Sequence, residues 1–166
     1  MLILVAGLVV ATLLVSVAGA VAFERRIPVL RRDEGEAPPP SVALLVPARD
    51  EEDVIEACLA SWLAQRDVQL EVRLIDDGSR DATVARARAV AGDDPRFQLL
   101  TAPPLPPGWF GKQAALAYGV RGVQSDWLLF VDADVRLEPD AARAAVDSAR
   151  RYGATLDRKS TRLNSS

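Results

Sequence analysis

The chain has 166 residues, which is enough for one domain with a substantial core. Its 20 basic and 23 acidic residues give a formal net charge of −3, and this balance argues against a nucleic-acid partner. The absence of histidine excludes His-based catalytic triads, His-ligated zinc and imidazole general bases from this sequence.

The first segment, residues 1–23, is uncharged and rich in Leu, Val and Ala. It is as long as the ~20 residues that cross a bilayer as a helix. A cleaved signal peptide is the alternative, since Ala18-Gly19-Ala20 resembles a cleavage site, but no Lys or Arg precedes the apolar run. Basic residues follow it instead, at Arg25, Arg26, Arg31 and Arg32. By the positive-inside rule we expect a single-pass anchor in the cell inner membrane, with the part of the chain that follows it in the cytoplasm.

Residues 24–41 form a basic, proline-rich linker. Beyond it, short apolar runs alternate with segments of helical periodicity. The runs predict strands at 42–46, 70–75, 97–100 and 127–131, and the periodic segments predict helices at 51–65, 81–91, 112–121 and 138–152. Strands that alternate with helices indicate an α/β fold with a parallel sheet, in a domain over residues 42–155.

Ligands of open α/β sheets bind beyond the C-terminal ends of the strands, and four predicted loops leave those ends. The loop at 47–52 ends in three acidic residues, which capping of the next helix would also explain. The loop at 76–83 begins with paired aspartates, more than capping needs, and indicates an acceptor for ribose hydroxyls or a base N–H. The loop at 106–112 places Lys112 at a helix N-terminus, which suits a phosphate, although a solvated lysine is the alternative.

The fourth loop is Asp132-Ala133-Asp134, which directly follows an apolar strand. Alternate residues of an extended segment point to the same side, so Asp132 and Asp134 can converge on one point. Two close carboxylates repel each other unless a cation neutralises them, and Mg²⁺ or Mn²⁺ favours such oxygen ligands beside substrate phosphates. An acidic turn without a metal is the alternative for this motif taken by itself.

The last segment, residues 156–166, is polar and without periodicity, and it resembles a translated adapter sequence. We interpret it as a non-native tail on a chain truncated within its α/β domain. A disordered natural terminus is the alternative.

Taken in order, four segments resemble an inverting family 2 glycosyltransferase of the Rossmann-like GT-A fold. They are Val46–Glu52, Ile75–Thr83, Gly111–Leu116 and Phe130–Asp134. The Pro106–Lys112 segment and the expected anchor further resemble the hopanoid- and carotenoid-associated branch. The resemblance implies a nucleotide-sugar donor of the UDP-sugar type, Mg²⁺ or Mn²⁺, and a membrane lipid or glycan as acceptor.

The resemblance also implies roles for individual residues. Pro47, Ala48 and Asp50 or Glu51 would line the nucleotide pocket. Asp76 and Asp77 would contact the uracil or ribose, and Lys112 would lie near the base and diphosphate. Asp132 and Asp134 would form the D-x-D motif, with Asp134 as the more direct metal ligand.

The chemistry of transfer agrees with these roles. Breaking a sugar–phosphate bond builds negative charge on the leaving diphosphate, which a metal stabilises. An inverting transfer also needs a general base, which the resemblance places further beyond the D-x-D than this chain extends. We therefore expect the chain to hold the donor half of an active site and to be inactive by itself.

Three alternatives stay open at this point. A haloacid-dehalogenase-like phosphatase has a D-x-D after its first strand, whereas here the motif follows three earlier strands. A nucleotidyltransferase would carry a glycine-rich signature after its first strand, which is missing. A membrane-anchored module that binds a nucleotide without turnover would need only the donor half.

Overall fold

The computed structural model describes residues 38–153. The predicted membrane anchor, most of the linker and the predicted tail lie outside the described residues. Within residues 38–153, no helix combines the length and the apolar character that crossing a membrane requires.

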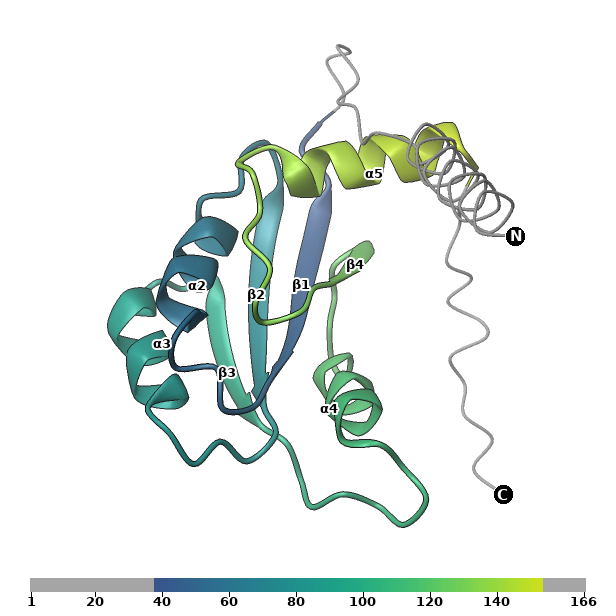
Figure 1. Ribbon diagram of the computed structural model, residues 1–166. Coiled ribbons are helices and arrows are strands. Elements are labelled where there is room, and N and C mark those ends of the chain that lie inside the picture. The colour runs from purple at the N-terminus through teal and green to yellow at the C-terminus, as the bar shows by residue number, and fades with distance from the viewer. Residues whose placement is uncertain (1–37, 154–166) are drawn as a thin grey trace, which may run out of the picture. The chain divides into compact units, whose positions relative to one another are not determined.

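The described chain forms a four-stranded sheet with helices between the strands (Figure 1). The strands are β1 (Ser41–Ala48), β2 (Gln69–Asp76), β3 (Phe97–Thr101) and β4 (Trp127–Phe130). The helices are α2 (Ile55–Leu63), α3 (Thr83–Ala91), α4 (Gly111–Gly119) and α5 (Ala141–Arg151). The strand order is β3-β2-β1-β4 and each pairing is parallel, which confirms the predicted parallel α/β sheet.

The predicted boundaries were wrong mainly at the helix starts. The helix predicted from residue 51 begins at Ile55, and the helix predicted from residue 81 begins at Thr83. The reason is that the residues before each helix bond to the other loop. The amide of Glu51 donates to Thr83 Oγ1 at 2.7 Å, and the amide of Glu52 donates to Asp81 Oδ2 at 3.1 Å.

The central strand β1 explains why the sheet is covered on both faces. Its residues 42–46 are fully buried, and their side chains alternate between two hydrophobic clusters. Val42, Leu44 and Val46 belong to the larger cluster, which includes apolar residues of α2, α3 and α5. Leu45 belongs to the smaller cluster, with Ile75 of β2 and Ala115 of α4. The apolar run in the sequence therefore reflects burial on two sides.

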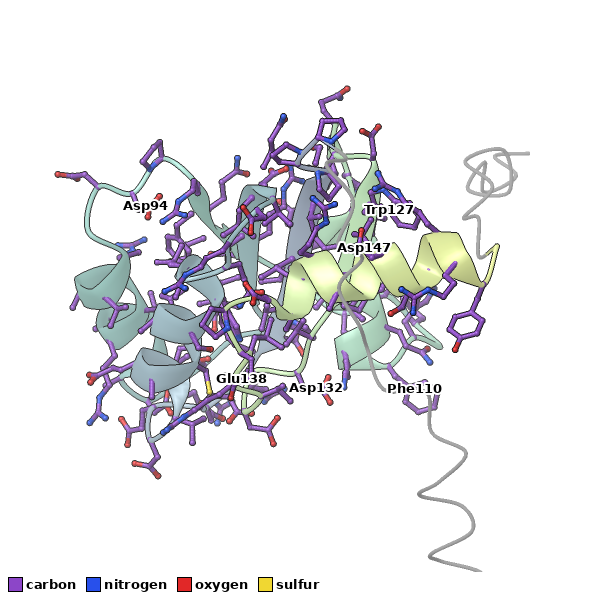
Figure 2. All side chains as sticks on the ribbon, turned by 90° about the horizontal axis from the view of Figure 1, so that it is seen from above. Asp94, Phe110, Trp127, Asp132, Glu138 and Asp147 are labelled. Atoms are coloured by element: carbon purple, nitrogen blue, oxygen red, sulfur yellow. The ribbon has the colours of Figure 1, made fainter. Side chains whose placement is uncertain are left out.

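Because the strands are parallel, their C-terminal ends meet at one edge of the sheet. The loops that follow β1, β2, β3 and β4 all leave from this edge. In Figure 2, Asp132 and Phe110 lie on the side of the molecule opposite to Trp127, which begins β4. The fold thus gathers the four polar loops of the sequence.

Candidate functional site

A pocket of about 370 Å³ lies at the C-terminal edge of the sheet. Its walls come from the end of β1, from the loops after β1, β2 and β4, and from the start of α4. The lining residues are Pro47, Ala48, Arg49, Glu51, Asp77, Lys112, Asp132, Ala133 and Asp134. The structure thus brings most of the predicted site residues together, and it leaves Asp50 and Asp76 out of the lining.

Asp50 and Asp76 have other contacts instead. Asp76 is buried, and its Oδ1 accepts a hydrogen bond from the amide of Ser79 at 3.0 Å. Asp50 has a φ of 55°, a left-handed conformation that aspartate tolerates better than most residues. Its amide donates to Ser79 Oγ at 3.1 Å, and its Oδ1 accepts from the amide of Arg80 at 2.7 Å. Both carboxylates therefore hold the two loops in shape.

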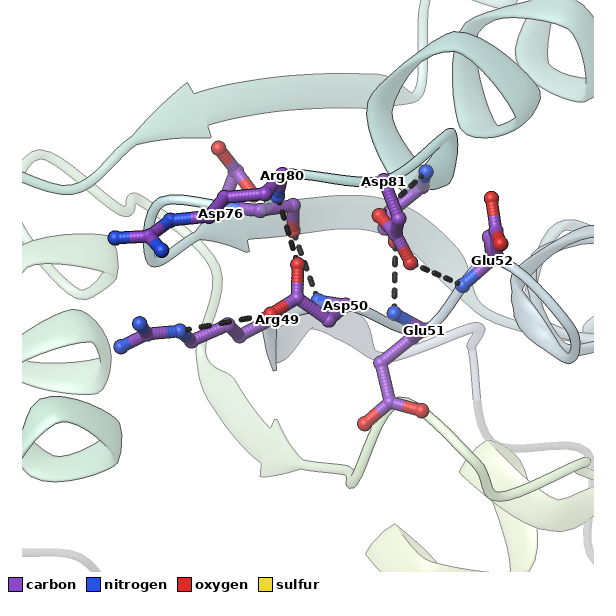
Figure 3. Close-up of polar contacts among 9 residues, drawn as sticks. Arg49, Asp50, Glu51, Glu52, Asp76, Arg80 and Asp81 are labelled. Atoms are coloured by element: carbon purple, nitrogen blue, oxygen red, sulfur yellow. Dashed lines mark hydrogen bonds and ion pairs between the residues drawn. The ribbon is translucent and has the colours of Figure 1, made fainter.

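The loops after β1 and β2 are joined by reciprocal hydrogen bonds (Figure 3). Glu52 donates its amide to Asp81 and accepts from the amide of Ala82 at its Oε2, 2.9 Å away. Asp81 also accepts from the amide and the hydroxyl of Thr83, at 2.9 and 2.6 Å. Burial acts to raise the pKa of Asp81, but the hydrogen bonds from Thr83 and from the Glu52 amide outweigh this and lower the pKa.

Glu51 connects this network to the pocket. Its amide donates a hydrogen bond to Thr83 Oγ1, while its side chain points away from the network and lines the pocket (Figure 3). Burial raises the pKa of Glu51, and the negative charges of Asp134, Asp81 and Asp50 raise it further. The ionised form of this carboxylate is thus disfavoured by its surroundings. A cation bound in the pocket would relieve that repulsion.

Lys112 is paired in the described structure. Its Nζ lies 2.6 Å from Asp132 Oδ1, and both side chains are more than half exposed. The pair places a positive charge directly beside the D-x-D, in a pocket that Arg49 also lines.

Helix α4, which carries Lys112, is held at both ends. At its start, a side chain on Gly111 would place its β-carbon 2.5 Å from Asp77 Oδ2, so only glycine permits this approach. At its end, Arg73 Nη1 donates to the carbonyls of Gly119 and Arg121, at 2.9 and 2.7 Å.

The close approach of Asp77 to Gly111 places the Asp77 carboxylate at the N-terminus of α4, which is the positive end of the helix dipole.

Two residues of the pocket were missed by sequence reasoning. Arg49 lies within the predicted first loop, and its positive charge among acidic residues was the available signal. Ala133 is 4% exposed and packs in the core like Val131, whereas Asp132 and Asp134 are exposed. Both aspartates line the pocket, but the expected extended geometry was wrong, because β4 ends at Phe130 and the amide of Val135 donates to the carbonyl of Asp132 in a turn.

The fit of a divalent metal follows from the donor set. Nowhere in residues 38–153 do three or more His, Cys, Asp or Glu side chains form a group that could hold a metal ion. Asp132 and Asp134 do offer hard oxygen ligands to the pocket. Mg²⁺ is commonly bound by one or two carboxylates together with substrate phosphates. The residues therefore fit an ion shared with a bound phosphate, and not one that the described residues hold alone.

Comparison with known proteins places these features in a wider context. A family model described as "Glycosyl transferase family 2" matches residues 43–158. The chain is 32% identical over 117 residues to the succinoglycan biosynthesis protein ExoO of Rhizobium meliloti, covering 70% of the chain and 32% of that protein. It is 31% identical over 132 residues to the 4,4'-diaponeurosporenoate glycosyltransferase of Staphylococcus haemolyticus, covering 78% of the chain and 34% of that protein.

Among solved structures, S. aureus TarS in complex with UDP matches with a TM-score of 0.56 and 20% identity. That match covers 68% of the chain and 33% of the solved TarS 1-349 chain, and at this identity it shows similarity of fold only. The chain spans about a third of the length of these relatives.

Proposed function

Because the chain belongs to glycosyl transferase family 2, we propose that its pocket binds the nucleotide-sugar donor of an inverting glycosyl transfer. The observation that carries this proposal is the pocket itself. It combines carboxylates from the β2 and β4 loops with two basic side chains at the edge where α/β sheets bind ligands. A donor with a sugar, a diphosphate and a base needs both kinds of group.

The basic residues suit the diphosphate. Lys112 at the start of α4 and Arg49 after β1 both line the pocket, and both can donate charge-assisted hydrogen bonds to phosphate oxygens. Asp77 can accept hydrogen bonds from ribose hydroxyls or from a base N–H. A UDP-sugar is the donor that we propose, since its uracil N–H and ribose hydroxyls are donors of this kind.

The D-x-D suits a divalent ion that the donor brings with it. We assign Asp134 as the main ligand, because Asp132 is already paired with Lys112. When bound, Mg²⁺ or Mn²⁺ would stabilise the negative charge that develops on the leaving diphosphate. The raised pKa of Glu51, caused by burial and by charges that include Asp134, supports a site that favours a cation.

The acceptor is proposed for the whole protein, since the chain spans only about a third of its relatives. We propose a membrane lipid or a glycan. The names of the relatives support both, one for a diaponeurosporenoate glycosyltransferase and one for succinoglycan biosynthesis. Attachment to the cell inner membrane, with this domain in the cytoplasm, rests on the apolar run at residues 1–23 and the arginines that follow it.

Calorimetry with UDP and Mn²⁺ tests the donor site. We expect UDP to bind the chain more tightly with Mn²⁺ than without it, and Asp134→Ala to weaken the metal-dependent part by at least about tenfold, as loss of a charged ligand predicts. Asp93→Ala, an exposed aspartate before β3, is the matched control and should bind normally. No binding of UDP by the unmodified chain would contradict the donor site, and undiminished metal-dependent binding by Asp134→Ala would contradict the metal assignment.

A further inference from the structure

The backbone around the D-x-D receives little support from the sheet. Strand β4 ends at Phe130, and the last bond to β1 runs from the amide of Val131 to the carbonyl of Leu45, at 3.2 Å. Beyond it, the amide of Val135 donates to the carbonyl of Asp132 at 3.1 Å and closes a turn that contains Asp134. Something other than strand pairing must therefore hold the far side of this turn.

The C-terminal end of α2 supplies that support, 73 residues away in sequence. The indole Nε1 of Trp62 donates to the carbonyl of Val135 at 2.8 Å. Ser61 Oγ accepts from the amide of Leu137 at 3.1 Å. Gln65 donates to the carbonyl of Glu138 and accepts from the amide of Ala142, both at 2.8 Å. Four residues between Val135 and Ala142 are thus bonded to the end of α2 and to Gln65 just beyond it.

Trp62 is well suited to fix this turn. Its side chain is fully buried in the larger cluster, so its ring has one position, and the indole N–H can serve only as a donor. The bonded carbonyl belongs to Val135, the residue directly after Asp134. A rigid donor therefore defines where the chain leaves the D-x-D.

We propose that Trp62, assisted by Ser61, is a positioning residue of the donor site, which sets the backbone of the D-x-D turn from the core. The proposal rests on the proposed function, because its consequence is the placement of Asp134 toward a metal-bound diphosphate. If Trp62 only stabilised the core, its replacement would lower the unfolding temperature without selectively weakening Mn²⁺ binding.

The test compares four variants of the full chain in two measurements. Electron paramagnetic resonance measures Mn²⁺ binding in the presence of UDP, and thermal unfolding measures stability. Trp62→Phe keeps a buried ring and removes the N–H. Ser61→Ala removes the hydrogen bond to the amide of Leu137 at a less buried position. This variant tests the positioning role if Trp62→Phe does not fold. Leu59→Ala, on the same helix and fully buried, is the control for lost packing, and Asp134→Ala is the control for the metal site.

We expect Trp62→Phe to weaken Mn²⁺ binding by about three- to tenfold, as the loss of one hydrogen bond predicts, and Ser61→Ala to weaken it in the same direction. UDP binding without metal should not change, and Leu59→Ala should lower the unfolding temperature with normal Mn²⁺ affinity. Normal Mn²⁺ binding in both Trp62→Phe and Ser61→Ala, with a loss in Asp134→Ala, would overturn the positioning role and leave the proposed function standing. An equal loss in Leu59→Ala would also overturn it. Normal Mn²⁺ binding in Asp134→Ala would overturn the metal assignment on which this proposal rests, whereas absence of UDP binding by the unmodified chain would overturn the donor site itself.

Discussion

Asp76 and Asp77 are neighbours in sequence, yet the structure gives them different surroundings. Asp76 completes β2, is buried and accepts the amide of Ser79. Asp77 lies one residue later, lines the pocket and lies against Gly111 at the start of α4. Successive residues of a strand point to opposite sides, so one aspartate of the pair contacts the protein and the other lines the pocket.

The close approach of Gly111 to Asp77 leads to a prediction. Gly111→Ala places a β-carbon 2.5 Å from Asp77 Oδ2, so the Asp77 side chain must move. We expect UDP affinity to fall by about tenfold, because a hydrogen bond to a charged group is lost or bent. The unfolding temperature should not fall, because alanine is the better helix former. Calorimetry and thermal unfolding measure the two effects.

Gly119, at the other end of α4, provides the matched control. A β-carbon there would lie 2.7 Å from Ile75 Cγ1 and Cδ1, in the smaller core cluster. Gly119→Ala should therefore cost about 1–3 kcal/mol of unfolding free energy through overpacking, with normal UDP affinity. The interpretation of Gly111 would be wrong if both variants changed the same property.

At the scale of elements, the connections before α2 and α3 cap each other. In neither helix does the N-cap residue make a side-chain capping bond. Amides of Glu51, Glu52 and Ala82 are instead satisfied by side chains of the opposite loop. The carboxylates of Asp50 and Glu52 after β1 accept amides of the connection before α3, and do not cap their own helix. This arrangement couples the pocket wall at Glu51 to the start of α3.

Thr83→Val tests this coupling. The two side chains have nearly the same shape, but valine cannot accept the Glu51 amide or donate to Asp81. Thr83 is fully buried, so we expect a loss of about 1–3 kcal/mol in the free energy of unfolding, measured in urea, and weaker UDP binding. Thr83→Ser keeps the hydroxyl and should retain most of both properties. Equal behaviour of the two variants would show that the hydroxyl has no such role.

At the scale of the whole domain, we expect an ion pair in the connection between α3 and β3 to contribute to stability in a pH-dependent way. The guanidinium of Arg96 donates to Asp94 at 3.0 and 2.7 Å, and the amide of Arg96 donates to it as well. The side-chain hydrogen bond from Arg96 is the main cause that lowers the pKa of Asp94 from 3.8 to about 2. The amide of Val72 in β2 donates to the carbonyl of Arg96, so the pair helps to place β3.

This pKa shift predicts how stability depends on pH. A carboxyl whose pKa is lowered in the folded state stabilises that state above pH 3.8, and the contribution is lost as the pH falls through about 2. Asp94→Asn should therefore be less stable than the unmodified chain at neutral pH, and the difference should shrink between pH 3.8 and 2. Urea unfolding over a pH series measures it, with Asp93→Asn as control. A difference that stays constant down to pH 2 would contradict the assignment.

The sequence by itself determined the elements and the type of sheet. The run at residues 42–46 is apolar because both of its faces are buried, and helical periodicity marks faces that pack on the sheet. Alternation of strands and helices then implies parallel pairing, which brings the polar loops to one edge. Residue patterns over short distances were sufficient for this, because burial acts on each element locally.

Only the tertiary structure decided how the polar side chains are shared between the pocket and the protein. The strand order β3-β2-β1-β4, the pairing of Lys112 with Asp132, and the bond from Trp62 to Val135 join positions far apart in the chain. Asp50 also makes a contact between distant positions, because its carboxylate accepts a hydrogen bond from the amide of Arg80 and does not line the pocket. Such contacts depend on the packing of two or more elements, and no local pattern of one element specifies them.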